Sequence, residues 1–238
     1  MTKQVKSKQR VADHGEVFTA EREVKAMCDL VKTETERIDS RFLEPACGDG
    51  NFLAEILSQK LAVVKKKYKK FPMDYEKNSV LAVSSLYGVD ILQDNCEACR
   101  ERLYRMWDKE YKAVCKKEVS EDCRRSVRFI LSRNIVCGNA LSLMCVDENQ
   151  QDTGDPIVFS EWAFVTGYQL QRSDYTFAKL MQGDDEARDL FAGTKKNRKQ
   201  WEQMALYEAE EPTEKPSDEG EFLKKYVTHY RRVWENEQ

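Results

Sequence analysis

Apolar residues recur at the spacing of an α-helix in several segments of the chain. The first segment predicts a helix over residues 20–35, capped by Thr19, with a buried stripe of Val24, Met27, Leu30 and Val31. The same periodicity predicts helices that start near Phe52 and that cover residues 93–117 and 120–132. Several amphipathic helices are therefore expected in the first 132 residues.

Short apolar runs lie between these helices and predict strands. They occupy residues 41–44 and 80–90, residues 134–141 contain a third strand and its loop, and residues 157–165 suit a further strand or a buried loop. A strand followed by a helix, repeated three times, gives a mostly parallel sheet with helices on both faces. The pattern predicts an α/β fold that is truncated after strand three or four.

The remaining segments are strongly charged. Lysines at 65–70, followed by Pro72, indicate an exposed helix end and a loop, which either contacts phosphates or is a solvated face. Acidic residues and prolines give residues 208–221 the composition of a linker, and the apolar spacing after it predicts a terminal amphipathic helix. That helix packs on its own domain or on another subunit. The expected parts are a basic segment at 1–18, a main domain at 19–183 and a charged extension at 184–238.

Composition narrows the class of protein. A chain of 238 residues that is 41% hydrophobic can bury one main core. It contains no apolar run of about 18 residues and no secretory signal, so we expect a cytoplasmic protein without a membrane partner. A net charge of −3 provides no general attraction to nucleic acid, so any DNA contact needs a local basic patch or a partner chain.

The eight cysteines are expected to be reduced thiols. Cys96 and Cys99 form a C-x-x-C pair, but Cys115 and Cys123 lack the spacing of a zinc ribbon. Both histidines lie far away in the sequence. The sequence therefore predicts no metal site.

A glycine pair marks a candidate ligand site. Gly48 and Gly50 lie between a predicted strand and a predicted helix, where the backbone can approach a ligand and free N–H groups favour negative charge. A dinucleotide fingerprint needs a third glycine where Leu53 stands, which argues against a nicotinamide cofactor. Asp90 ends the next strand and can accept hydrogen bonds from ribose hydroxyls, and Asn139 can read an adenine edge. The pattern favours an adenosyl ligand.

These segments resemble the motifs of DNA adenine-N6 methyltransferases of restriction-modification systems. The run EPACGDGNFL at 44–53 is similar to their first S-adenosylmethionine motif, acidic-Pro-x-Cys-Gly-x-Gly-x-Phe-Leu. HGEVFT at 14–19 is similar to the Gly-x-x-Phe-Thr-Pro segment, although Ala20 replaces the proline. YGVDI at 87–91 and GNAL at 138–141 resemble the ribose and adenine motifs. The resemblance covers about residues 11 to 145.

The resemblance implies a Rossmann-like methyltransferase fold and S-adenosyl-L-methionine as the cofactor. The methionine end would lie against Phe18, Thr19, Glu44, Ala46, Cys47, Gly48 and Gly50. Ribose and adenine would lie against Asp90, Ile91, Asn139, Ala140 and Leu141. For Phe18 and Ile91 ordinary core packing is the alternative.

One motif of that family is missing. Its members stack a flipped adenine against an Asp/Asn/Ser-Pro-Pro-aromatic loop. All five prolines of this chain are isolated, so no Pro-Pro pair occurs. The resemblance implies a cofactor-binding subunit that is inactive alone and meets DNA through a second subunit, which supplies the catalytic loop and target recognition. The alternative is a non-catalytic, truncated methyltransferase that acts as a regulatory or interaction module.

Overall fold

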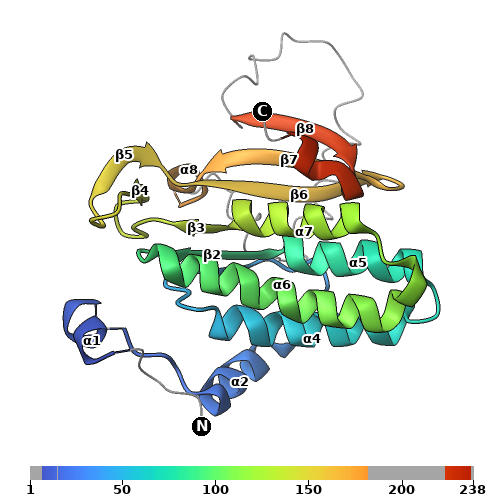
Figure 1. Cartoon of the computed structure of the whole chain (residues 1–238), viewed down its shortest axis with the longest axis horizontal. Coiled ribbons are helices and arrows are strands. Elements are labelled where there is room, and N and C mark those ends of the chain that lie inside the picture. Colours follow the sequence, from blue (N-terminus) through green and yellow to red (C-terminus); the bar gives the residue numbers. More distant parts are fainter. Residues whose placement is uncertain (1–6, 15, 182–222, 237–238) are drawn as a thin grey trace, which may run out of the picture.

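The computed structural model describes residues 7–14, 16–181 and 223–236 (Figure 1). Its helices are α1 (Lys8–His14), α2 (Glu21–Leu30), α3 (Lys32–Thr35), α4 (Asn51–Tyr68), α5 (Pro72–Ser84), α6 (Gln93–Cys115), α7 (Glu121–Asn134) and α8 (Phe177–Met181), with short 3-10 helices η1 (Lys116–Glu118) and η2 (Tyr230–Asn236). Its strands are β1 (Phe42–Glu44), β2 (Leu86–Asp90), β3 (Ile135–Cys137), β4 (Met144–Val146), β5 (Asp152–Pro156), β6 (Val158–Thr166), β7 (Gln169–Thr176) and β8 (Lys224–His229).

The strands form one parallel and two antiparallel sheets. β1, β2 and β3 pair in parallel in that order, with Leu43 opposite Tyr87 and Val89 opposite Val136. The α/β class is confirmed, and all three predicted strands are present. The prediction of one mostly parallel sheet is wrong, because β4 pairs with β5 in one antiparallel sheet, and β7 pairs with both β6 and β8 in another. The alternating polar and apolar residues of 158–176 suit a hairpin with one solvated face.

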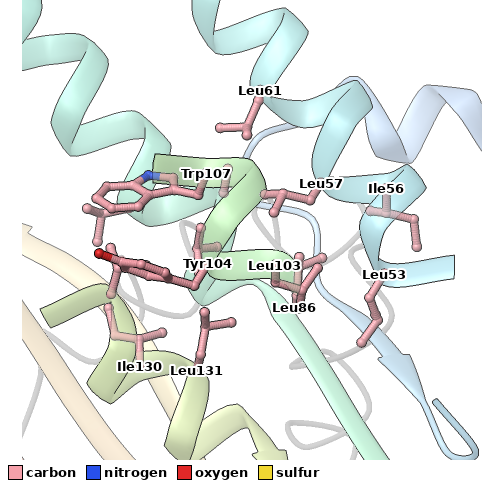
Figure 2. Close-up of a cluster of buried hydrophobic side chains, with 14 of the residues drawn as sticks. Leu53, Ile56, Leu57, Leu61, Leu86, Leu103, Tyr104, Trp107, Ile130 and Leu131 are labelled. Carbon is pink, nitrogen blue, oxygen red and sulfur yellow. The ribbon is translucent and has the colours of Figure 1, made fainter. Parts of the chain in front are cut away.

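The parallel sheet has two different neighbours. Figure 1 shows β2 and β3 between helices α4 and α6 on one side and strands β6 and β7 on the other. Side chains such as Leu86 and Ile135 face the helical core, where α4, α6 and α7 contribute Leu53, Ile56, Leu57, Leu61, Leu103, Tyr104, Trp107, Ile130 and Leu131 (Figure 2). Tyr87 and Val89 face the opposite way, against Phe159 of β6 and Phe177 of α8. The predicted second layer of helices is therefore replaced, in the described residues, by a strand and one short helix.

The predicted start of the second strand is wrong. Residues 80–84, predicted as strand, belong to α5, which starts at Pro72, and β2 begins only at Leu86. Proline is favourable in the first turn of a helix because its missing N–H has no partner there. The buried Val80, Ala82 and Val83 therefore continue a helical face rather than a strand.

The predicted helix over residues 20–35 is divided into α2 and α3 at Val31. Its buried face is formed by Val24 and Cys28, whereas Met27, Leu30 and Val31 are exposed, so the predicted stripe is wrong in three positions. Thr19 does not cap it either, because Ala20 is the N-cap residue and no side chain bonds to the first turn.

The C-terminal segment is a strand and a 3-10 helix, not the predicted amphipathic helix. β8 pairs with β7, placing Thr228 opposite Leu170, and Tyr230 and Val233 of η2 are buried in the helical core. Packing on its own domain, one of the two alternatives, is the arrangement observed. The β-branched and aromatic residues of 226–228 fit the strand. The predicted linker at 208–221 and the boundary at 183–184 lie outside the described residues.

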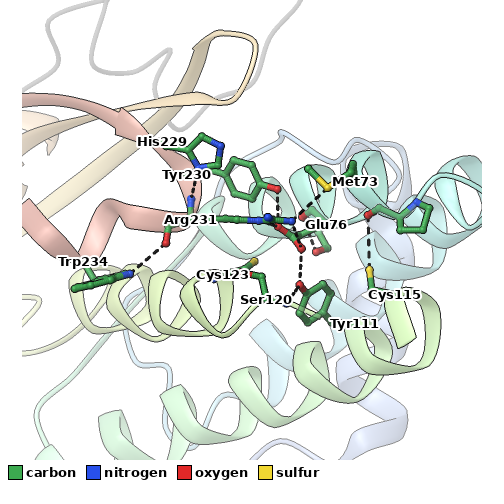
Figure 3. A network of polar contacts seen from close by, with 12 residues as sticks. Met73, Glu76, Tyr111, Cys115, Ser120, Cys123, His229, Tyr230, Arg231 and Trp234 are labelled. Carbon is green, nitrogen blue, oxygen red and sulfur yellow. Dashed lines mark hydrogen bonds and ion pairs between the residues drawn. The ribbon is translucent and has the colours of Figure 1, made fainter. Parts of the chain in front are cut away.

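Glu76 of α5 joins η2 to the helices (Figure 3). Its carboxylate is 1% exposed and accepts hydrogen bonds from the hydroxyls of Tyr111 and Tyr230, the latter at 2.5 Å. Arg231 donates to both oxygens, through Nε at 2.5 Å and Nη2 at 3.1 Å. Tyr111 in turn accepts the N–H of Ser120 at 2.8 Å. One buried charge is thus neutralised by a residue more than 150 positions away in the sequence.

Lys60 of α4 is a second buried charged side chain. Its Nζ donates to the carbonyl oxygens of Ile38, at 3.0 Å, and Ser40, and to Ser85 Oγ at 2.7 Å. It thereby joins the segment before β1 to the end of α5. Burial lowers the pKa of Lys60 to about 7.

This lowered pKa predicts a pH-dependent stability. Above pH 7 and below the ordinary pKa of 10.5, the unfolded chain binds a proton that folded Lys60 has lost, so the free energy of unfolding rises with pH. Between about pH 7 and about pH 8.5, the free energy of unfolding of wild type should rise relative to that of Lys60→Met by up to about 1.4 kcal/mol per pH unit. Urea denaturation at several pH values measures this difference. A constant difference would mean that the folded and unfolded pKa values of Lys60 are equal.

Among the described residues, no helix combines the length and the apolar character needed to cross a membrane.

Candidate cofactor-binding site

A cavity of about 520 Å³ opens where the three parallel strands end. Open α/β sheets bind their ligands at the carboxyl ends of the strands, so this is the expected place for a site. Four separate segments meet there, and they contribute Glu16, Val17, Phe18, Thr19, Glu44, Pro45, Ala46, Cys47, Gly48, Asn51, Phe52, Asp90, Ile91, Leu92, Asn95, Gly138, Asn139, Ala140 and Leu141.

Eleven of the twelve residues predicted to bind the cofactor line this cavity: Phe18, Thr19, Glu44, Ala46, Cys47, Gly48, Asp90, Ile91, Asn139, Ala140 and Leu141. The structure thus gathers residues up to 123 positions apart in the sequence, from Phe18 to Leu141. Gly50 is the exception. It is the N-cap of α4 and faces the protein interior, where an added Cβ would lie 2.6 Å from Cys99 Sγ.

The loop between β1 and α4 needs both of its glycines. Gly48 and Gly50 have φ values of 54° and 86°, in the region that favours glycine. A Cβ on Gly48 would lie 2.9 Å from the Phe18 ring. The loop is also tied to the sheet, because the N–H of Cys47 donates to the Val89 carbonyl at 2.9 Å. The turn therefore presents its backbone to the cavity beneath the ring of Phe18.

The carboxylate of Asp90 is bonded inside the protein. One oxygen accepts the N–H of Gly48 at 2.9 Å, and the other accepts the N–H of Leu92 at 2.9 Å and Asn95 Nδ2 at 3.1 Å. Asp90 is only 9% exposed. Its first role is therefore to join the glycine loop to the turn after β2. A carboxylate has about four acceptor sites, so one remains for a ligand hydroxyl.

The segment before α2 closes one side of the cavity. Glu16 accepts hydrogen bonds from Arg10 Nε at 2.6 Å and from Asn95 Nδ2 at 2.8 Å, and Arg10 also bonds to Asp94 at 2.7 Å. Asn51 Nδ2 donates to the Thr19 carbonyl at 3.5 Å. The ion pairs hold α1 against the start of α6, and the hydrogen bond to Thr19 links the segment after Phe18 to the start of α4. Arg10 is thereby linked to residues 16–18, which line the cavity.

The loop after β3 has a turn built by Asn139. Its side-chain oxygen accepts the N–H groups of Leu141 at 3.0 Å and Ser142 at 3.4 Å, and its Nδ2 donates to Asp152 at 3.4 Å. The amide is thus engaged with its own loop. Leu141 is 96% exposed at the rim of the cavity and Val17 is 60% exposed. Two apolar side chains therefore lie in solvent at the entrance.

Eight further residues line the cavity and were not among the predicted site residues: Glu16, Val17, Pro45, Asn51, Phe52, Leu92, Asn95 and Gly138. All except Asn95 lie within or next to a recognised motif, so their proximity in sequence could have indicated them. The position of Asn95 depends on the rotation of α6 about its axis, which directs Asn95 but not Glu97 towards Asp90.

Two titratable groups beside the loop have raised pKa values. A hydrogen bond to the Cys99 thiol and burial raise the pKa of Cys47, and burial raises the pKa of Glu44 despite the N–H of Ala46. Cys47 is therefore a packed thiol rather than a reactive thiolate. Throughout the described ranges, no three His, Cys, Asp or Glu side chains gather in a way that can hold a metal ion.

Comparison with protein-family models, with curated proteins and with solved structures gives no match to this chain.

Proposed function

We propose that this chain is the S-adenosyl-L-methionine-binding subunit of a DNA adenine-N6 methyltransferase of the restriction-modification type, and that it transfers no methyl group by itself. The observation that carries the proposal is the gathering of four motif segments around one cavity. Three of these segments follow parallel strands and therefore meet at one edge of the sheet, and residues 16–19 join them there from before α2.

The size and the walls of the cavity fit this ligand class. A volume of about 520 Å³ lies in the usual range of about 300–1,000 Å³ for small-ligand sites. Exposed Leu141 and Val17 provide apolar surfaces for an adenine ring, and burying them under a ligand is favourable. The backbone N–H groups at the start of α4 favour the carboxylate of the methionine end.

In this proposal Asp90 and Asn139 act chiefly by shaping the site. Asp90 holds the glycine loop and offers its remaining acceptor site to a ribose hydroxyl. Asn139 holds the loop that carries Ala140 and Leu141 against the adenine. The Rossmann-like description of the fold belongs to the same proposal, and the parallel order β1-β2-β3 supports it.

Methyl transfer in this proposal needs a second polypeptide. The chain contains no Pro-Pro-aromatic loop, and the region after β3 forms the hairpin β6–β7, which packs on the sheet. Trp162 is buried and donates to Asn134 Oδ1 at 2.9 Å, so it is not available to stack a flipped base. The partner would supply the catalytic loop and target recognition.

The second candidate is a non-catalytic module that binds the same cofactor and regulates or recruits another protein. It is favoured by the same engagement of Trp162 within the core. A reconstituted complex separates the two candidates. Methyl incorporation that requires both this chain and its partner supports the subunit, and incorporation by the partner without this chain supports the module.

A variant at the entrance tests cofactor binding. Leu141→Asp should weaken binding of S-adenosyl-L-methionine about tenfold, because it removes apolar contact with the adenine, worth about 1–2 kcal/mol. Leu30→Asp is the matched control, since Leu30 is 86% exposed on α2 and does not line the cavity. Titration calorimetry on both variants measures the effect. Equal affinities would remove Leu141 from the site.

A further inference from the structure

A group of exposed lysines lies at the end of the molecule opposite the cavity. α4 and α6 run side by side and end together (Figure 1), and Lys65 at the end of α4 pairs with Glu110 of α6 at 2.8 Å. The thiol of Cys115, the last residue of α6, donates to the carbonyl oxygen of Pro72, the first residue of α5, at 3.6 Å. We define the basic patch as the exposed side chains on these two ends: Lys66, Lys67, Lys69, Lys70, Lys116 and Lys117.

The basic patch is locally unbalanced in charge. In the described part of the chain, no carboxylate lies within 4.0 Å of any of its six ammonium groups. Asp74, in the first turn of α5, and Glu118 of η1 are exposed carboxylates in the same two segments, which leaves an excess of four positive charges in a chain of net charge −3. Lysines at a helix C-terminus complement its dipole, but that effect is confined to the last turn. Lys69, Lys70 and Lys117 lie beyond the last turn of α4 and α6.

Lys116 has an unusual backbone conformation. Its φ is +49°, in the region that favours glycine, and it directly follows α6. A lysine at this position lowers stability relative to glycine. Backbone strain of this kind persists where the surrounding structure holds the residue in place, and it is often found at functional sites.

We propose that the basic patch binds the phosphate backbone of nucleic acid. Interfaces between proteins are depleted in lysine, whereas lysines neutralise phosphates as point charges. Membrane binding also needs apolar side chains that insert into the lipid. Phe71 is a single large exposed apolar side chain beside these lysines, which favours nucleic acid over a membrane surface. This inference goes beyond the proposed function and does not depend on cofactor binding.

The basic patch and the cavity are separated by the length of α4. This helix starts at the cavity with Asn51 and has 18 residues, a length of about 27 Å. Nucleic acid on the patch therefore occupies a surface distinct from the cavity entrance, and its binding is independent of S-adenosyl-L-methionine.

Fluorescence anisotropy with a labelled duplex of about 20 base pairs tests the proposal, over about 50–200 mM salt and without cofactor. Replacing Lys66, Lys67, Lys69 and Lys70 by Gln should weaken binding at least tenfold and reduce the salt slope by about 2–4. The matched control replaces four exposed lysines elsewhere, Lys8, Lys25, Lys32 and Lys224, by Gln. Equal weakening in both variants, or no binding by wild type at low salt, overturns the proposal.

Two further measurements define the ligand. Lys116→Gly should bind the duplex more weakly while melting no lower than wild type, which separates lost charge from lost structure. Vesicles of phosphatidylserine are the competing polyanion. Tighter binding to vesicles than to the duplex, with the same dependence on the four lysines, would assign the basic patch to a membrane surface instead.

Discussion

Replacing Glu76 by Ala should destabilise the protein by about 3–5 kcal/mol, the cost of breaking a buried ion pair by removing one partner. Arg231 would lose both of its carboxylate contacts, and the hydroxyls of Tyr111 and Tyr230 would lose their acceptor. Arg231 is 26% exposed and regains some water, which favours the lower end of this range. Urea denaturation measures the change.

The exposed Glu97 of α6 provides the control, since Glu97→Ala should change stability by less than about 0.5 kcal/mol. Glu76→Gln keeps an acceptor oxygen but loses the charge, so its stability should lie between that of wild type and that of Glu76→Ala. A Glu76→Ala variant within about 1 kcal/mol of wild type would mean that η2 does not depend on Glu76 for its attachment.

Asp90→Ala should abolish measurable binding of S-adenosyl-L-methionine. Gly48 and Leu92 would lose the acceptor for their N–H groups, and Asn95 would lose a partner on the other side of the turn. The glycine loop then no longer has one fixed position. We expect a fall in affinity of at least about 100-fold, because each lost charged hydrogen bond contributes about 1.5–3 kcal/mol.

Asp49→Ala is the matched control. Asp49 belongs to the same loop but points to Arg102, at 3.3 Å, and does not line the cavity. Its affinity should stay within about threefold of wild type, since an exposed ion pair contributes little. Calorimetry on both variants gives the comparison. If Asp90→Ala bound as tightly as Asp49→Ala, the glycine loop would keep its shape without Asp90.

The cavity residues could be predicted because they lie in short motifs whose spacing fixes the local backbone. Gly48 requires positive φ and Asp90 ends a strand, so both positions follow from sequence. The roles of their side chains could not be predicted. Asp90 bonds to the Gly48 N–H, 42 positions earlier, and such a contact depends on how the strands align.

The second half of the fold was less predictable for a related reason. Residues 226–234 have apolar spacing that suits a helix or a strand, and the pairing of β8 with β7 decides between them. Glu76 likewise occurs in an unremarkable helical segment, and its importance arises from Arg231, 155 positions away. Tertiary contacts override local propensity in both places.

Titration of the wild-type chain with S-adenosyl-L-methionine, followed by calorimetry, tests the central claim most directly. We predict saturable binding at one site per chain, with S-adenosylhomocysteine competing for the same site. Absence of heat and of competition up to millimolar ligand would contradict the claim, and would leave the convergence of the four motifs around the cavity without a ligand to explain it.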